Sequence, residues 1–447
     1  MKRHLALLAV LCSAISLCFT APAQSPKPPE AAPATIIKAG RVLDVKAGKY
    51  LDGQSVLVRD GNIEAIAPAT ELQKQTPGAK VIDLGNATLL PGMIDCHTHL
   101  LENYDFKLNG DDPNMLLTVA TMSPASRALL GAKMGLEDLE AGITTVRDVG
   151  NSGVNGDVAL RDAIRAGWVK GPRIAASTRA LSAAGGQFGP LQTGAQSLVA
   201  QEYVVVSNPN EARAAVQQAF YDGADLIKVI VNTGTRVIAP DTMKAIVDEA
   251  HRVHAKVAAH AIGDDPTRIA ADAGADSIEH AYTVPDEVLK IMAEKHIFLV
   301  PTDTGSTSFQ YFIEAGATPE ERKKQEERMR EGGKHVQERL RRAIAAGVPI
   351  AFGSDEYYQF PGLTRGQATL LTLDAYSESG MTPLQIIQAA TVNGADLIGA
   401  KHLGVLEKGK AADIIAVMGD PLKDINLLHQ VKFVMKKGEV YRNEINH

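Results

Sequence analysis

Two histidines separated by one residue, His97 and His99, are the side chains of this chain best suited to chemistry. Positions i and i+2 of a β-strand point to the same face, so both imidazoles can reach one metal ion. A His-x-His pair also arises by chance on surface strands. Its place directly after the run Leu89-Leu-Pro-Gly-Met-Ile-Asp95 favours a metal-binding pair.

Two further histidines each close a short apolar run. His260 ends residues 255–260, and His280 ends residues 274–280. A lone histidine is more often structural than a ligand. Two of them at the ends of successive strands favour ligands of a second metal ion, because neutral imidazole binds zinc and similar ions.

Lys228 lies inside the apolar run 223–231. A buried lysine is costly unless it is paired or neutral. Reaction of the neutral amine with carbon dioxide would give a carbamate, an anion able to bridge two metal ions. The alternative is a lysine whose ammonium reaches solvent at the strand end, and the nearby histidines favour the carbamate.

Asp355 ends the run 350–355. A carboxylate there can bind a metal ion and accept the proton of an attacking water. A helix N-cap is the common alternative. Together with the other candidates, Asp355 predicts a hydrolase that uses two metal ions.

The elements that must position these residues alternate between strands and helices over residues 91–400. Helical patterns include residues 240–254, 267–273 and 319–346, and strand candidates are residues 93–99, 143–149, 173–180, 225–231, 256–260, 276–280, 296–302 and 349–355. Eight strands, most followed by a helix, predict an α/β protein with a (β/α)₈ TIM barrel. The candidate residues fall at the strand ends that form active sites in such barrels.

Short strands and turns precede and follow this region. Residues 35–90 contain an Asp60-Gly61 pair between two alternating runs, which indicates a hairpin. Residues 401–447 show the same pattern of short strands separated by turns. We therefore predict one small β-sandwich built from both ends of the chain, beside a barrel at residues 91–400.

The N-terminal residues have the pattern of a secretory signal. Lys2 and Arg3 precede an apolar stretch, and Ala21-Pro-Ala23 offers a cleavage site, so we predict a signal peptide at residues 1–23 and a Pro/Ala-rich tether at residues 24–34. A membrane anchor is the alternative, but the apolar stretch is shorter than the ~20 residues of a bilayer span. The mature protein is expected to be periplasmic or secreted and free of the membrane. Cys96 would be its only cysteine, which excludes an internal disulfide and predicts a small buried side chain.

Composition is that of an ordinary globular protein. The chain has 447 residues, 45% hydrophobic and 22% charged, with a formal charge of −6. No basic cluster suggests a nucleic-acid partner. A small molecule or a dipeptide is the expected partner.

Four motifs are specific enough to carry a resemblance: Gly223-Ala-Asp-Leu-Ile-Lys228-Val, His260-Ala-Ile-Gly263, Ala273-Gly-Ala-Asp-Ser-Ile-Glu-His280 and Phe352-Gly-Ser-Asp355. With them the chain resembles the amidohydrolase superfamily over nearly its whole mature length. The likeness is to the binuclear subgroup with a carboxylated lysine, which includes Xaa-Pro dipeptidase-like, carboxypeptidase-like and ochratoxin-hydrolysing enzymes.

The resemblance implies a ligand set. His97, His99 and Asp355 would bind one metal ion, His260 and His280 the other, and Lys228, carboxylated by carbon dioxide, would bridge them. Zinc is the expected metal. The resemblance also implies a homo-oligomer, of which an octamer is one form.

The implied activity is cleavage of the amide bond of dipeptides, N-acyl amino acids or ochratoxin-type amides. A hydroxide shared by the two metal ions would attack the carbonyl, and Asp355 would accept its proton and deliver it to the leaving nitrogen. Two alternatives stay open. One is an imidazolonepropionase-like hydrolase of cyclic amides, which commonly uses one metal ion, and the other is a non-catalytic periplasmic metal-binding protein.

Three residues are candidates for substrate binding. Relatives often carry a histidine where this chain has Gln187, which could give the scissile carbonyl only a neutral hydrogen bond. Arg236, after the fourth strand, could clamp a substrate carboxylate, unless it faces solvent. Tyr357 belongs to a group of aromatic residues that could line an apolar pocket or pack between subunits; the others are Phe309, Tyr311, Phe312, Tyr358 and Phe360.

Overall fold

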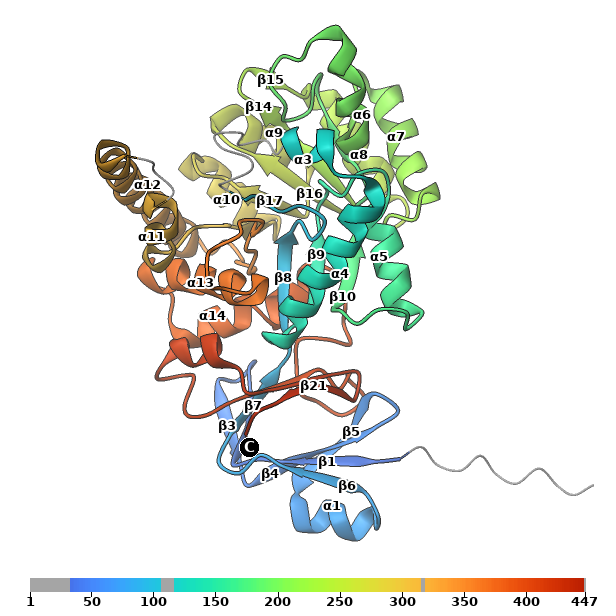
Figure 1. Ribbon diagram of the computed structural model, residues 1–447, viewed down its shortest axis with the longest axis vertical. Helices are drawn as coiled ribbons and strands as arrows, with labels where there is room; N and C mark the ends of the chain where they lie inside the picture. The colour runs from blue at the N-terminus through green and yellow to red at the C-terminus, as the bar shows by residue number, and fades with distance from the viewer. Residues whose placement is uncertain (1–32, 106–115, 315–317, 446–447) are drawn as a thin grey trace, which may run out of the picture. The chain divides into compact units, whose positions relative to one another are not determined.

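The computed structural model describes residues 33–105, 116–314 and 318–445 (Figure 1). The predicted signal peptide lies outside these residues, as do residues 24–32 of the predicted tether. Among the described residues, no helix combines the length and the apolar character that a membrane span needs.

The first strands form a four-stranded sheet in the order β5-β4-β1-β6. Its strands are β1 (Thr35–Lys38), β4 (Gln54–Arg59), β5 (Asn62–Pro68) and β6 (Lys80–Asp83), and helix α1 (Ala69–Gln75) joins the last two. β4 and β5 pair in antiparallel fashion across Asp60 and Gly61, whose φ angles are 51° and 73°. Two successive positive φ angles are those of the type I′ turn that joins strands with the right twist, so the predicted hairpin is confirmed.

A second sheet contains strands from both ends of the described chain, in the order β21-β20-β19-β7-β2-β3. Its members are β2 (Arg41–Asp44), β3 (Lys49–Asp52), β7 (Thr88–Pro91), β19 (Ile414–Val417), β20 (Phe433–Lys436) and β21 (Glu439–Asn443). β7 pairs with β2 on one side and β19 on the other. Apolar side chains of both sheets, including Ile37, Val56 and Phe433, form one buried cluster.

Apart from the short antiparallel pair β14 (Asn232–Thr233) and β15 (Arg236–Val237), the remaining strands of the described chain are parallel. They are β8 (Met93–Thr98), β9 (Ile143–Asp148), β10 (Arg173–Ala176), β11 (Ala180–Ser182), β12 (Tyr203–Val205), β13 (Leu226–Ile230), β16 (Lys256–Ala261), β17 (Ser277–His280) and β18 (Phe298–Val300). They pair in the orders β10-β9-β8 and β12-β11-β13-β16-β17-β18. The third expected strand is divided into β10 and β11, and the amide of Asp225, just before β13, donates to Ala176 O at 2.7 Å.

The regular eighth strand expected at residues 349–355 is not present. The segment instead contacts its neighbours through single bridges, from Ile350 to Leu299 and from Glu356 to Thr98. Backbone hydrogen bonds still tie it to β8, since Cys96 N donates to Phe352 O and Asp355 N donates to His97 O, both at 2.8 Å. Asp355 has a φ of 52°, in the left-handed region, so extended backbone cannot continue through it.

Helices follow most of the parallel strands and lie around them in Figure 1. They are α3 (Leu116–Thr121), α4 (Pro124–Glu140), α5 (Gly156–Arg165), α6 (Val199–Glu202), α7 (Pro209–Tyr221), α8 (Pro240–His251), α9 (Asp264–Ala273), α10 (Asp286–Glu294), α11 (Ser306–Glu314), α12 (Pro319–Ala345), α13 (Arg365–Glu378), α14 (Pro383–Ala389) and α15 (Val392–Leu397). Two short 3₁₀ helices, η1 (Thr193–Leu198) and η2 (Ile425–Gln430), and the two-stranded pair β14 (Asn232–Thr233) and β15 (Arg236–Val237) complete the elements.

Local sequence explains where several helices begin. Thr318, Thr364 and Thr382 each form a capping box at the start of α12, α13 and α14. The predicted helices at residues 240–254, 267–273 and 319–346 are confirmed, although α8 ends three residues early, at His251. Cys96 is fully buried beside Ile94 and outside the cavity described below, as predicted.

Candidate active site

All six predicted metal ligands line one cavity of about 210 Å³. His97 belongs to β8 and His99 follows it, Lys228 lies in β13, and His260 and His280 lie near the ends of β16 and β17. Asp355 comes from the irregular segment beside β8. The structure therefore brings together side chains that are up to 258 positions apart in the chain, from His97 to Asp355.

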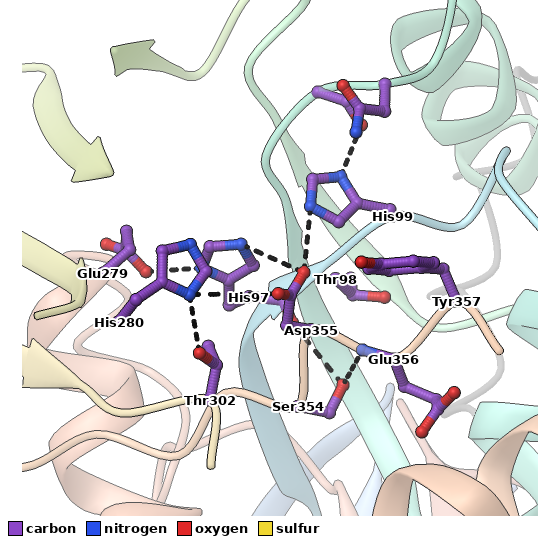
Figure 2. Close-up of polar contacts among 12 residues, drawn as sticks. His97, Thr98, His99, Glu279, His280, Thr302, Ser354, Asp355, Glu356 and Tyr357 are labelled. Carbon is purple, nitrogen blue, oxygen red and sulfur yellow. Dashed lines mark hydrogen bonds and ion pairs between the residues drawn. The ribbon is translucent and has the colours of Figure 1, made fainter. Parts of the chain in front are cut away.

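The carboxylate of Asp355 lies among three imidazoles (Figure 2). Its Oδ1 is 3.2 Å from His99 Nε2 and 3.5 Å from His97 Nε2, and its Oδ2 is 3.8 Å from His280 Nδ1. One ligand atom each of His97, His280 and Asp355 lie within 4.8 Å of one another, a spacing at which they could hold one metal ion. Two imidazole nitrogens and a carboxylate oxygen are donors that suit zinc.

Hydrogen bonds fix the tautomers of the first two histidines. His97 Nδ1 lies 2.7 Å from Glu279 Oε2, and His99 Nδ1 lies 2.8 Å from the carbonyl oxygen of Gly150. Both partners are acceptors, so each Nδ1 carries the proton and each Nε2 keeps its lone pair. A metal-binding histidine needs this arrangement, which a carboxylate or carbonyl partner commonly provides.

Glu279 is itself held in place. Arg147 NH2 donates to its two carboxylate oxygens at 2.8 and 2.9 Å, and Ser277 Oγ donates to Oε1. Arg147 and Glu279 are both buried. The ring of His97 is thus oriented through a chain of buried charge-assisted hydrogen bonds.

His280 is oriented by Thr302. The hydroxyl of Thr302 donates to Pro301 O at 2.7 Å, which leaves it to accept from His280 Nδ1 at 2.6 Å. His280 Nε2 is therefore the nitrogen left for a ligand. His280 and Thr302 have φ angles of 67° and 55°, and such strained backbone gathers at functional sites.

Lys228 is buried, and its Nζ lies 3.4 Å from His97 Nε2. Burial lowers the pKa of Lys228 to about 8, against the opposing effect of Glu279 and Asp355. Burial and the nearby Lys228 likewise lower the pKa of His260 to about 3. The amine loses its proton readily and the imidazole stays neutral, as carbamate formation and metal binding require.

Asp95 fastens β8 to the segment that carries Asp355. Its Oδ1 accepts from His97 N at 2.9 Å and Ser354 N at 3.1 Å, and its Oδ2 accepts from Ser354 Oγ at 2.6 Å. Burial raises the pKa of Asp95 to about 6. Asp95 and Glu279 were not predicted as site residues, although both lie on strands of the candidate metal site: Asp95 is two positions before His97, and Glu279 directly precedes His280.

Two of the three substrate-binding candidates reach the cavity. Gln187 and Tyr357 line it, and the ring centroids of Tyr357 and His99 are 6.0 Å apart. Arg236 does not line it. Its NH1 donates to Ala184 O at 2.6 Å and its NH2 to Phe188 O at 2.7 Å, so the guanidinium holds the loop that carries Gln187. The carboxylate clamp at Arg236 stays a prediction, and this placement gives it no support.

Tyr311, Phe312, Tyr358 and Phe360 pack on one another, and neither they nor Phe309 line the cavity. Tyr311 stacks on Phe360 with ring centroids 4.6 Å apart, and Phe312 meets Tyr358 at 4.8 Å. The expected aromatic pocket is therefore reduced to Tyr357 at this cavity, because α11 and residues 358–360 use their aromatic rings to pack against each other.

The sequence profile of the amidohydrolase family matches residues 88–441. The chain belongs to this family. It is a hydrolase that acts on C–N bonds of amides or peptides, and metal dependence is typical of such enzymes. The profile begins at β7 and ends within β21, so it includes every residue of the cavity described above.

Similar proteins include an ochratoxinase of Aspergillus niger, 28% identical over 438 residues that cover 91% of this chain and 86% of that protein. Its crystal structure has a TM-score of 0.77, at 27% identity, over 93% of this chain and 96% of that one. A Xaa-Pro dipeptidase crystallised with methionine in its active site has a TM-score of 0.76 at 29% identity, over 92% and 100%. An imidazolonepropionase of Symbiobacterium thermophilum is 27% identical over 83% of this chain and 85% of its own. The structural neighbours imply a TIM-barrel fold.

Proposed function

We propose that this protein is a binuclear metal-dependent amidohydrolase that releases the C-terminal amino acid from dipeptides or N-acyl amino acids. The observation that carries the proposal is the meeting of four histidines, Lys228 and Asp355 in one cavity. The likeness to a Xaa-Pro dipeptidase and an ochratoxinase supports this substrate class.

The donor set fits two divalent metal ions, for which we propose zinc. His97, His99 and Asp355 would hold one ion and His260 and His280 the other, with carboxylated Lys228 between them. The bound ions would activate water and polarise the scissile carbonyl. The 3.4 Å contact between Lys228 Nζ and His97 Nε2 and the lowered pKa of Lys228 support the bridging role.

Asp355 would transfer the proton. Its carboxylate lies within hydrogen-bond reach of His99 and close to His97 and His280, so it can accept a proton from the attacking water and pass it to the leaving nitrogen. Gln187 and Tyr357, on the cavity wall, would contact the substrate.

Several finer features belong to the same proposal. The parallel strands and residues 349–355 would close into a (β/α)₈ barrel, and the two flanking sheets would form a β-sandwich from both ends of the chain. The shared cluster of Ile37, Val56 and Phe433 supports the sandwich. We further propose export through the N-terminal signal and assembly as a homo-oligomer.

Hydrolysis of a panel of N-acyl amino acids and of Xaa-Pro, Xaa-Phe and Xaa-Arg dipeptides tests the function. The zinc-loaded protein should release the C-terminal amino acid, and chelated protein and Lys228→Ala should not. Release of no amino acid, with two metal ions bound per chain, would contradict the proposed substrate class.

The likeness to an imidazolonepropionase supports hydrolysis of a cyclic amide as the second candidate function. Imidazolone propionate therefore belongs in the panel. Ring opening without dipeptide cleavage would replace the first proposal with the second, and metal binding without turnover of any substrate would favour the non-catalytic alternative.

A further inference from the structure

Glu102 is a buried carboxyl group on the wall of the active-site cavity that has no role in the proposed hydrolysis. It lies three residues beyond His99, is 1% exposed, and lines the same cavity as the six candidate ligands. Its Oε2 has no hydrogen-bond partner in the part of the chain that the structure describes. A buried carboxylate oxygen without a partner is costly, so such an oxygen in a binding cavity indicates a missing donor.

The guanidinium of Arg127 donates its hydrogen bonds to acceptors other than Glu102. Arg127 Nε donates to Leu101 O at 3.1 Å, NH1 donates to Glu202, and NH2 donates to Asn151 O. Glu202, also buried, accepts from Gly153 N at 3.1 Å as well. Each group of Arg127 that can donate thus has an acceptor other than Glu102. Arg127 therefore forms its ion pair with Glu202, and the carboxyl group of Glu102 receives no hydrogen bond from it. Burial raises the pKa of Glu102 to about 8, and a cation bound beside it would favour the carboxylate form.

The wall around Glu102 offers no other cation. Among the described residues that line the cavity, Lys228 is the one lysine or arginine, and it lies beside His97, where burial lowers its pKa to about 8. The neighbouring polar groups on this side are neutral: Tyr203 OH donates to Asn151 Oδ1 and Gln187 Oε1, both at 3.3 Å. A cation on the substrate would therefore meet Glu102 and neutral acceptors.

We propose that Glu102 is a specificity residue that binds a cationic nitrogen of the substrate, an ammonium or a guanidinium. The inference rests on the proposed amide hydrolysis and narrows its substrates to amides that carry such a cation. The cation can be the free α-amino group of a dipeptide or the side chain of a lysine or arginine. A charge-assisted hydrogen bond in a buried site is among the stronger polar contacts, and removing it should be visible in kinetics.

Matched substrate pairs separate the two sources of the cation. One pair is glycyl-L-proline and N-acetylglycyl-L-proline, which differ in the α-ammonium. The other is N-acetyl-L-alanyl-L-lysine and N-acetyl-L-alanyl-L-norleucine, which differ in the side-chain ammonium. kcat/KM is measured for wild type, Glu102→Gln and Glu202→Gln, all loaded with zinc and checked for metal content. Glu202→Gln is the matched control, because Glu202 belongs to the same buried cluster and does not line the cavity.

Glu102→Gln should lower kcat/KM for the cationic member of one pair about 10- to 100-fold and leave the neutral member nearly unchanged, with metal content intact. Glu202→Gln should affect both members of each pair equally. Equal loss on both members in Glu102→Gln, or loss of metal from that variant, would assign Glu102 a structural or metal-balancing role and overturn the proposal.

Binding measurements test the cation site independently of the proposed hydrolysis. Calorimetric titration of the same pairs into zinc-loaded Asp355→Asn and Asp355→Asn/Glu102→Gln proteins needs no turnover. If wild type hydrolyses neither these four compounds nor any member of the dipeptide and N-acyl amino acid panel, the proposed function fails. A preference for a cationic member that Glu102→Gln abolishes would still support the cation site, and the absence of any preference would overturn it.

Discussion

Asp355 is the side chain around which the proposed chemistry is arranged. It contacts three imidazoles within 3.8 Å, and its left-handed backbone turns the carboxylate toward them. The amide of Asp355 is held by His97 O, and the preceding Ser354 is held by Asp95. The carboxylate is therefore positioned by β8, the strand that carries His97 and ends just before His99.

Replacement of Asp355 by asparagine separates metal binding from proton transfer. The amide keeps an oxygen that can act as a ligand but cannot accept a proton, so turnover should fall about 10²- to 10⁴-fold while metal content changes little. Metal analysis and kcat on a cleaved dipeptide check both parts. Near-normal turnover in this variant would remove Asp355 from the proton-transfer role.

Glu279 should act through His97 rather than on the substrate. Glu279→Gln can still accept from His97 Nδ1, but it loses the charge that Arg147 stabilises and that raises the basicity of the ring. We expect metal affinity to fall roughly 10- to 100-fold. Competition with a fluorescent chelator measures this affinity.

Glu356→Gln is the matched control for that experiment. Glu356 is also buried and lies next to Asp355 in the chain, but its Oε1 accepts from Tyr358 N and it does not line the cavity. Similar metal affinity in both variants would mean that Glu279 has no special role in orienting His97.

At the scale of elements, sequence patterns predicted the strands well where apolar runs are continuous. β8, β9, β13, β16 and β17 coincide with predicted strands and carry or adjoin the candidate residues. The break between β10 and β11 and the irregular residues 349–355 were not predictable. Both depend on contacts with distant strands, and the positive φ of Asp355 is maintained by its neighbours rather than by its own preference.

The hydrogen-bond partners of long side chains could not be predicted from the sequence either. An arginine after the fourth strand could have faced the cavity, but Arg236 turns to two backbone carbonyls. The orientation of a long flexible side chain depends on nearby acceptors, which only the folded chain brings together. His97 and His99 were predictable because their spacing alone puts them on one face of a strand.

Gly353 tests the close approach of the irregular segment to β8. A Cβ at this position would lie 2.3 Å from Val300 Cγ1 and 2.8 Å from His97 Cβ. Gly353→Ala should therefore displace Asp355 or His97, lower the free energy of unfolding by about 1–3 kcal/mol and reduce activity. Chemical denaturation and kcat measure the two effects.

Gly332 provides the control for this substitution. It lies exposed in α12, and a Cβ there meets no atom within 4 Å. Gly332→Ala should leave activity unchanged and raise the free energy of unfolding by up to about 1 kcal/mol, since alanine favours helix. If Gly353→Ala left kcat unchanged and did not lower the free energy of unfolding, as expected of Gly332→Ala, residues 349–355 would not pack tightly against β8.

At the scale of the whole described chain, buried charges tie the C-terminal strands to the parallel strands. Lys436 of β20 donates to Gly171 O, just before β10, and Arg173 of β10 pairs with Asp413, just before β19. The site-bearing strands and the flanking sheets thus share polar contacts as well as one large apolar cluster.

Lys436 makes this connection dependent on pH. Burial lowers its pKa to about 8, below the ~10.4 of an unfolded lysine. Between these values the unfolded chain binds more protons, so this group makes the free energy of unfolding rise with pH. The stability difference between wild type and Lys436→Met should shift in favour of wild type from pH 7.5 to pH 9.5, as urea denaturation can show. The same difference at both pH values would contradict the buried, perturbed ammonium.

A binuclear site bridged by Lys228 is tested most directly by a zinc titration of chelator-stripped protein, supplied with bicarbonate and a cleavable dipeptide. We expect hydrolysis to reach its full rate only as the second zinc equivalent per chain binds. Lys228→Ala should retain fewer than two equivalents and stay inactive. Full activity at one equivalent, or unchanged activity in Lys228→Ala, would contradict a binuclear site bridged by Lys228.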